Sequence, residues 1–128
     1  MSDIGQSLHI SWTELACNDG TPYPFRDERV IELVVMFERI RALIKEPLII
    51  NSAYRTIEYN KKIGGSPKSQ HLSGRALDIQ LPKNISATLF FDLLKTRHKE
   101  FGIRGLGLYK TFVHCDIRDS DKLIEWNG

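Results

Sequence analysis

The chain has 128 residues, of which 41% are hydrophobic and 27% charged, a balance that predicts one globular domain over residues 1–128. The 18 basic and 16 acidic residues leave a net charge of +2 without a basic block, which argues against a nucleic-acid partner. The two cysteines lie far apart, which excludes a CxxC metal or redox motif, and charged residues interrupt every apolar run before the roughly 20 residues that span a membrane.

The first predicted element is an amphipathic helix over residues 27–45. Apolar side chains recur there at three- and four-residue steps, with charged residues on the opposite side. Pro47 ends this helix, and the apolar run at 48–50 predicts a short buried strand. A second, shorter helix is expected over 57–63, and residues 64–73 are expected to form an exposed loop.

A strand and a helix are expected next. Apolar residues alternate with others from 75 to 81, which predicts a strand that turns Asp78 away from its more apolar face. Ser86 can cap a helix that continues to about residue 100. The predicted core side of this helix consists of Leu89, Phe90, Leu93 and Leu94.

The last part of the chain predicts two strands joined by a tight connection. We interpret Gly102, Gly105 and Gly107 as turn residues and expect strands at 107–109 and 111–118. The connection between these strands is too short for a crossover helix. We therefore expect an α+β domain with a small, mostly antiparallel sheet and flanking helices.

Three side chains form a candidate metal site: His71, Asp78 and His114. His71 lies in the expected loop, Asp78 on the strand seven residues later, and His114 on the last strand. Two histidine nitrogens and one carboxylate are ligands that a catalytic zinc uses when its fourth position is kept for water. Spacing alone leaves another interpretation open, in which the histidines are surface or hydrogen-bonded residues and Asp78 belongs to a turn or an edge.

Longer motifs surround these residues. SQHLSGRALDI at 69–79 fills every fixed position of an SxHxxGxAxD signature, and NSAYRTIEYN at 51–60 is similar to SGYR-x-x-x-YN, with Ala53 in place of glycine. FVHCDIR at 112–118 is similar to an FVHxDxR ending, and WTELACNDG at 12–20 resembles a segment close to FxCxDG. In these motifs the chain resembles the D-Ala-D-Ala carboxypeptidase family of zinc peptidases, especially its short, single-domain, phage endolysin-like members.

The resemblance implies a fold, a reaction and a set of roles. The fold would be that of the D-Ala-D-Ala and hedgehog-like peptidases, with one zinc ion held by His71, Asp78 and His114. A zinc-activated water would hydrolyse peptide bonds of peptidoglycan stem peptides or cross-links, next to D-alanine. Arg55 would hold the developing oxyanion or a substrate carboxylate, with a surface ion pair to Glu58 or Asp78 as the alternative.

The general base does not transfer from the resemblance. Several relatives carry an acidic residue three positions before the last zinc histidine, but Thr111 stands there and cannot accept a proton at neutral pH. Asp116 lies two residues after His114 on the same strand face, so we expect it to act as the base. The alternative role for Asp116 is that of an acceptor that orients a zinc histidine.

Two functions of other classes stay open. One is a zinc-containing module that binds a wall peptide or a protein without cleaving it, and the other is a metal-free structural protein, for example part of a phage tail. We expect a monomer without nucleic-acid or membrane partners. Residues 1–11 carry no secretory signal, so we expect synthesis in the cytoplasm and action on the bacterial cell wall, as for a phage lysin or a virion part.

Overall fold

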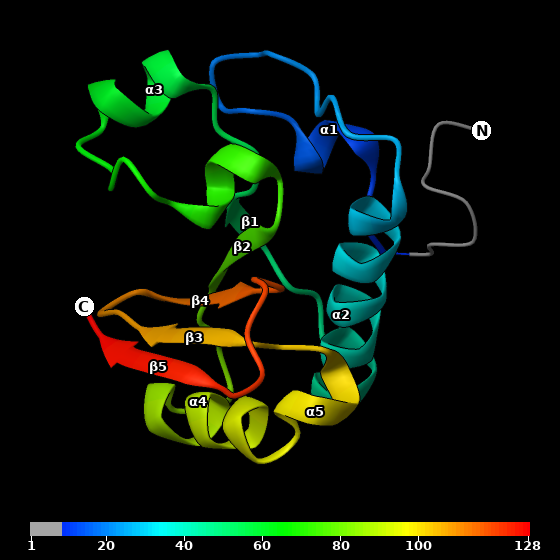
Figure 1. Ribbon diagram of the computed structural model, residues 1–128. Coiled ribbons are helices and arrows are strands. Elements are labelled where there is room, and N and C mark those ends of the chain that lie inside the picture. Colours follow the sequence, from blue (N-terminus) through cyan, green and yellow to red (C-terminus); the bar gives the residue numbers. More distant parts are fainter. Residues whose placement is uncertain (1–8) are drawn as a thin grey trace.

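The computed structural model describes residues 9–128 of the protein, and its elements are drawn in Figure 1. The helices of this part of the chain are α1 (Trp12–Leu15), α2 (Glu28–Ile44), α3 (Ile57–Lys62), the 3-10 helix η1 (Gln70–Ser73), α4 (Ala87–Thr96) and α5 (His98–Phe101). The strands are β1 (Ile50–Ser52), β2 (Ala76–Gln80), β3 (Gly105–Leu108), β4 (Phe112–Asp116) and β5 (Ile124–Asn127).

Two expectations concern membranes and export. Among the described residues, no helix combines the length and the apolar character that crossing a membrane requires. The expectation of no secretory signal rests on residues 1–11, and most of these lie outside the described residues.

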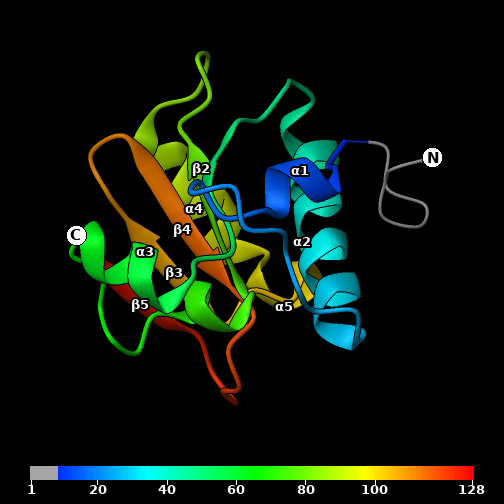
Figure 2. The same cartoon turned by 90° about the horizontal axis from the view of Figure 1, so that it is seen from above.

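The strands form one sheet in the order β1-β2-β4-β3-β5. Neighbouring strands are antiparallel except β3 and β5, which run parallel. Figures 1 and 2 together place α3 and α4 on opposite sides of this sheet and α2 beside it. The expected α+β fold, with a mostly antiparallel sheet and flanking helices, is therefore confirmed.

One row of residues crosses the whole sheet. Its members, each the ladder partner of the next, are Ser52, Asp78, His114, Gly107 and Trp126. Side chains at partner positions point to the same face of a sheet, with their Cβ atoms about 4.5–5.5 Å apart. The row therefore gathers polar and aromatic side chains from distant parts of the chain on one face.

Helix α2 supplies one wall of the core, as its periodicity predicts. Asp27 caps its first turn by accepting a hydrogen bond from the backbone N–H of Arg29, and Lys45 ends it in the left-handed region at φ 61°. The apolar stripe of α2 belongs to the same buried cluster as Leu77 and Ile79 of β2. The buried α2 side chains are Val30, Leu33, Val34, Met36, Phe37, Ile40 and Ile44.

Several other predicted elements are found at their expected places. Helix α3 and strands β2 and β4 lie within the ranges expected at 57–63, 75–81 and 111–118. The segment expected as a loop at 64–73 does begin as one, but its last four residues form η1. Local signals were sufficient for these elements, because Thr56 caps α3 and the two strands bury apolar side chains in the core.

The strand expected at 48–50 is displaced along the chain. Strand β1 begins at Ile50, which pairs with Ile79, and ends at Ser52, which pairs with Asp78. Leu48 is buried but lies before the strand. The expected burial is therefore found at Leu48 but is wrong at Ile49, which is 54% exposed, and the strand bounds depend on the ladder with β2.

The long helix expected after the capping serine is divided into α4 and α5. Arg97, at φ −105° and ψ 16°, separates the two. The predicted core side is wrong at Leu89, which is 51% exposed, while Phe91 is buried with Phe90 and Leu94. Two adjacent phenylalanines turn the buried face of α4 toward Phe91, which leaves Leu89 on the outer flank.

Two of the three glycines interpreted as turn residues lie inside strand β3. A Cβ atom on Gly105 would lie 2.3 Å from the carboxylate oxygens of Asp116, and one on Gly107 would lie 2.5 Å from the indole of Trp126. Only Gly102 fits the turn interpretation, because it ends α5 at φ 77°. The strand expected at 107–109 therefore starts earlier, and its glycines make room for neighbouring side chains.

Two described elements have no counterpart among the predicted ones. Helix α1 is one turn long and is closed by a capping box, in which Ser11 and Glu14 each accept a hydrogen bond from the other's backbone N–H. Strand β5 is mostly exposed and pairs in parallel with β3. Neither element has the apolar periodicity that predicts a helix or a strand.

Substitution of Gly74 tests how η1 is joined to β2. Gly74 has φ 68°, and an added Cβ would lie 2.5 Å from the Phe25 ring, so Gly74→Ala combines left-handed strain with overpacking and should lower the free energy of unfolding by about 2–5 kcal/mol. Gly102→Ala is the matched control, because φ is 77° and nothing lies within 4 Å, and should lose only about 1–2 kcal/mol. Urea unfolding measures both values. Equal losses would contradict the packing of Phe25 on Gly74.

Candidate metal centre and surrounding pocket

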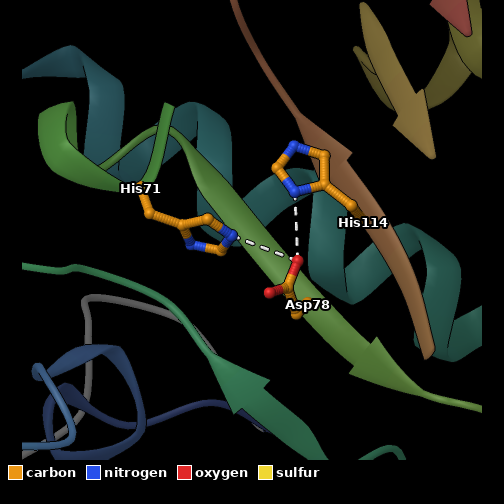
Figure 3. Close-up of side chains that lie close together, drawn as sticks. All are labelled: His71, Asp78 and His114. Carbon is orange, nitrogen blue, oxygen red and sulfur yellow. Dashed lines mark hydrogen bonds and ion pairs between the residues drawn. The ribbon is translucent and has the colours of Figure 1, made fainter. Parts of the chain in front are cut away.

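The three candidate metal ligands converge in the structure. His71 Nε2 lies 3.1 Å from Asp78 Oδ1, and His114 Nδ1 lies 3.0 Å from the same oxygen. One ligand atom from each residue falls within 4.8 Å of the others, and all three residues are buried. Figure 3 shows the two imidazole rings directed toward the Asp78 carboxylate from η1 and β4.

Local structure explains how each ligand is placed. Asp78 and His114 are ladder partners on β2 and β4, so the sheet itself brings their side chains together. His71 comes from η1, where the Ser69 hydroxyl accepts a hydrogen bond from its backbone N–H. Gly74 then turns the chain from η1 toward β2 in the left-handed conformation.

Each imidazole ring makes a hydrogen bond on the side that points away from the centre. This bond determines which ring nitrogen carries the proton and which one directs a lone pair toward the centre. His71 Nδ1 lies 2.5 Å from the carbonyl oxygen of Ala53, which only accepts, so the proton is on Nδ1. His114 Nε2 lies 2.8 Å from Asp116 Oδ2, which also accepts, so the proton is on Nε2. In neutral rings, His71 Nε2 and His114 Nδ1 therefore point unprotonated lone pairs toward Asp78.

The buried Nε2 atom of His71 is an unsatisfied polar group. Although Nε2 is 3.1 Å from Asp78 Oδ1, it has no hydrogen-bond partner in the described chain. Two lone pairs and a carboxylate oxygen at such short range repel one another unless a positive charge lies between them. A tetrahedral ion with ligand bonds of 2.0–2.1 Å spaces its ligands by about 3.3 Å, close to the distances seen here. The residues therefore fit a divalent cation such as zinc.

The site shifts the pKa of the three residues in different directions. Burial lowers the pKa of His71, and the nearby Asp78 carboxylate offsets only part of this effect. Burial also acts to lower the pKa of His114, but its hydrogen bond to Asp116 and the charges of Asp78 and Asp116 outweigh it and raise the pKa. For Asp78, burial acts to raise the pKa, but its close contacts with His114 and His71 hold it well below its usual range. The centre therefore contains a carboxylate at neutral pH, whose charge a cation would balance.

Asp116 lies on the other side of the His114 ring from Asp78. Its carboxylate is fully buried and accepts three hydrogen bonds from Arg118, one from the backbone N–H at 3.1 Å and two from the guanidinium at 2.9 and 2.7 Å. Burial acts to raise the pKa of Asp116, but hydrogen bonds from Arg118 and His114 outweigh it and lower the pKa to about 2. A group with these contacts is a weak proton acceptor and a strong hydrogen-bond acceptor.

Arg55 contacts the candidate centre directly. Its Nη2 lies 3.2 Å from Asp78 Oδ2, the oxygen that the histidines leave free, and its side chain is only 13% exposed. Nε donates to the Ser52 hydroxyl at 3.1 Å, and Nη1 donates to Asn60 Oδ1 at 3.1 Å. Of the two ion pairs considered from the sequence, the described contacts contain the one with Asp78, and it is largely buried.

Asn60 has a structural role that sequence reasoning did not assign. Its buried amide accepts from Arg55 and donates to the carbonyl oxygen of Ser66 at 2.9 Å, and its backbone carbonyl accepts from Gly65 N–H at 2.8 Å. A Cβ atom on Gly65 would lie 2.0 Å from the Asn60 amide oxygen, so the loop packs closely here. The signal was the asparagine of the motif at 51–60, which also contains Arg55.

A pocket of about 560 Å³ opens over the candidate centre. Its lining residues come from the loop 64–70 and from the ends of β3, β4 and β5, together with the centre itself. Part of the lining, called here the aromatic wall, consists of Tyr109, Phe112 and Trp126. Of the residues that line the pocket, only Asp78 carries a carboxylate, and Thr111 is not among them.

The aromatic wall is fixed against the centre. The rings of Tyr109 and Phe112 stack at 4.5 Å, and Trp126 Nε1 donates to the Tyr109 hydroxyl at 2.9 Å. The Trp126 ring lies 5.2 Å from the His114 ring, which it reaches across Gly107, the ladder partner of both residues. The absence of a side chain at Gly107 therefore allows Trp126 to cover one flank of His114.

Comparison with known protein families gives one relevant finding. A family model described as Peptidase M15 matches residues 8–116. The matched region contains His71, Asp78 and His114, together with Arg55 and Asp116. The search of curated proteins finds no match to the chain.

Gly107→Ala should displace Trp126, because the added methyl group would lie 2.5 Å from the indole nitrogen. We expect the indole N–H resonance and the His114 ring resonances to shift together in NMR spectra. Tyr109→Phe is the control, since it removes the acceptor of the indole N–H but keeps the ring stack, and it should shift the indole resonance alone. An unchanged indole resonance in Gly107→Ala would contradict the close approach.

Proposed function

The chain belongs to the peptidase M15 family, and from this membership we propose that it is a zinc-dependent peptidase acting on the peptides of bacterial peptidoglycan, next to D-alanine. The observation that carries the proposal is the convergence of two histidine lone pairs and one carboxylate in a buried centre below a pocket. We further propose that it acts as a monomer on the cell wall, as a phage lysin or a virion part would.

The proposed zinc ligands are His71 Nε2, Asp78 and His114 Nδ1. A zinc ion held there would act as a Lewis acid and lower the pKa of a coordinated water to about 7, so that the water can attack a peptide carbonyl. Ala53 and Asp116 would keep the two rings in the required tautomers through their hydrogen bonds. Arg55 would balance the charge on the outer oxygen of Asp78.

Arg55 is also proposed to contact the substrate. A guanidinium has five N–H donors, and the described contacts occupy three of them, one each on Nε, Nη1 and Nη2. Arg55 lines the pocket, so the remaining donors can stabilise the oxyanion that develops on the peptide carbonyl. Its ion pair with Asp78 and its substrate contact are compatible, because different N–H groups make them.

For Asp116 we propose the orienting role rather than that of the base. The two nitrogens of an imidazole point in divergent directions, and Asp116 contacts Nε2 while Nδ1 faces the centre. Asp116 does not line the pocket, and Arg118 occupies its oxygens. Its lowered pKa disfavours proton acceptance for the same reason.

One observation favours a second function, that of a zinc-containing module that binds peptides without cleaving them. Among the residues that line the pocket, no carboxylate besides Asp78 is available as a base, and Thr111 occupies the position that is acidic in several relatives. Such a module would keep the zinc and bind the same peptides. Release of new amino groups from peptidoglycan distinguishes the two functions.

Zinc removal and replacement of His71 test the proposed function. Purified protein should contain about one equivalent of zinc, release amino groups from peptidoglycan, lose this activity with a chelator and regain it with added zinc. His71→Ala should lose both the zinc and the hydrolysis, whereas His98→Ala, which removes a histidine outside the centre, should keep both. Metal analysis and an amino-group assay measure these outcomes. A full equivalent of zinc in His71→Ala would rule out the proposed ligand set, and zinc without hydrolysis in the unsubstituted protein would favour the binding module.

Asp116→Asn separates the orienting role from that of a base. If Asp116 orients His114, zinc affinity should fall about 10- to 100-fold, while hydrolysis at saturating zinc stays within about tenfold of the original rate. Asp119→Asn removes the same charge from an exposed neighbour and should change neither quantity. Competition with a chromogenic chelator gives the affinity, and the amino-group assay gives the rate. Unchanged affinity with a rate lowered a hundredfold or more would identify Asp116 as the base.

A further inference from the structure

The positively charged residues that line the pocket differ in whether they form an ion pair. Of its three cationic lining residues, Arg55 is paired with Asp78 and Arg118 with Asp116. The third, Lys68, is exposed, and its ammonium has no ion-pair partner among the described residues. The pocket therefore presents one unpaired positive charge, on the side of the loop 64–70.

The backbone that carries Lys68 is held in a defined position. Lys68 N–H donates to the Ser66 hydroxyl at 3.2 Å, and Ser69 N–H donates to the Ser66 carbonyl oxygen at 3.0 Å. The same carbonyl accepts from the buried amide of Asn60, which also holds Arg55. The loop is thus connected to the candidate centre by a short path of hydrogen bonds, which holds the backbone from which the Lys68 side chain extends.

The aromatic part of the pocket lining has a different character. Tyr109, Phe112 and Trp126 present stacked and hydrogen-bonded rings, and the Trp126 indole N–H is already used by the Tyr109 hydroxyl. Arg118 lies 5.1 Å from the Trp126 ring, but its charge is paired with Asp116. Lys68 therefore supplies the unpaired cation of the lining, which favours a substrate with a carboxylate within its reach.

We propose that Lys68 determines specificity by binding a carboxylate of the peptide substrate at the loop side of the pocket. This inference rests on the proposed peptidase function and names the substrate class more closely. A lysine ammonium is a compact charge on a flexible stem, suited to a carboxylate whose position varies somewhat between substrates. The carboxylate can be the C-terminal one of the residue released or one inside the stem peptide.

The test compares Lys68→Gln with Lys62→Gln, which removes the same charge from an exposed position on α3 that does not line the pocket. Both are assayed, zinc-loaded, on three synthetic stem peptides: one with all carboxylates free, one with a C-terminal amide, and one with the internal carboxylate amidated. For the fully acidic peptide, Lys68→Gln should raise KM about tenfold, which corresponds to about 1.4 kcal/mol, and Lys68→Arg should restore most of the loss. Lys62→Gln should behave like the unsubstituted protein.

The amidated peptides identify the source of the carboxylate. The unsubstituted protein should lose about tenfold in kcat/KM on whichever amide removes the contact, and Lys68→Gln should lose nothing further on that peptide. Equal KM values for Lys68→Gln and Lys62→Gln, or no preference for either free carboxylate in the unsubstituted protein, would overturn the inference. If the unsubstituted protein cleaves none of the peptides, the proposed function fails and calorimetry decides the role of Lys68. Binding of the acidic peptide about tenfold weaker in Lys68→Gln would then support it, and equal binding would overturn it.

Discussion

The register between β2 and β4 is the constraint on which the candidate centre depends. It places Asp78 directly opposite His114. The next pair on the same face of the sheet is Ala76 and Asp116. Side chains of a strand alternate between faces, so a shift of one residue in this pairing would turn either Asp78 or His114 into the core. The ladder hydrogen bonds of the sheet thus position two of the three candidate ligands, Asp78 and His114, while η1 supplies His71.

Close polar contacts join the centre to its surroundings in one continuous chain. Its members, in order of contact, are Asn60, Arg55, Asp78, His114, Asp116 and Arg118. Each of the two buried carboxylates is paired with an arginine, which avoids uncompensated charge in the interior. Loss of one partner in such a chain leaves a buried charge unbalanced, so the residues of the site contribute to stability as well as to function.

The sequence predicted the elements and the clustering of candidate ligands whose signals are local. The stripe of α2 and the motif around His71 each lie within a short segment, and both predictions agree with the fold and the convergence seen here. Strand β5 was missed because its residues are mostly exposed and its pairing with β3 is a long-range contact. Gly105 and Gly107 were misinterpreted because glycine commonly marks turns, whereas here each makes room for a side chain from another strand. Contacts between segments far apart in sequence, such as the one between Arg55 and Asp78, cannot be inferred from local periodicity.

The loop 64–70 differs from the rest of the site in how freely its sequence can change. It lies outside the sheet ladder, and most of its side chains are exposed, whereas the ligands are buried in the sheet and in η1. Substitutions at its exposed positions can therefore accumulate during evolution without disturbing the buried candidate ligands or the core. Drift in this one segment can change the lining of the pocket while the buried centre is inherited unchanged.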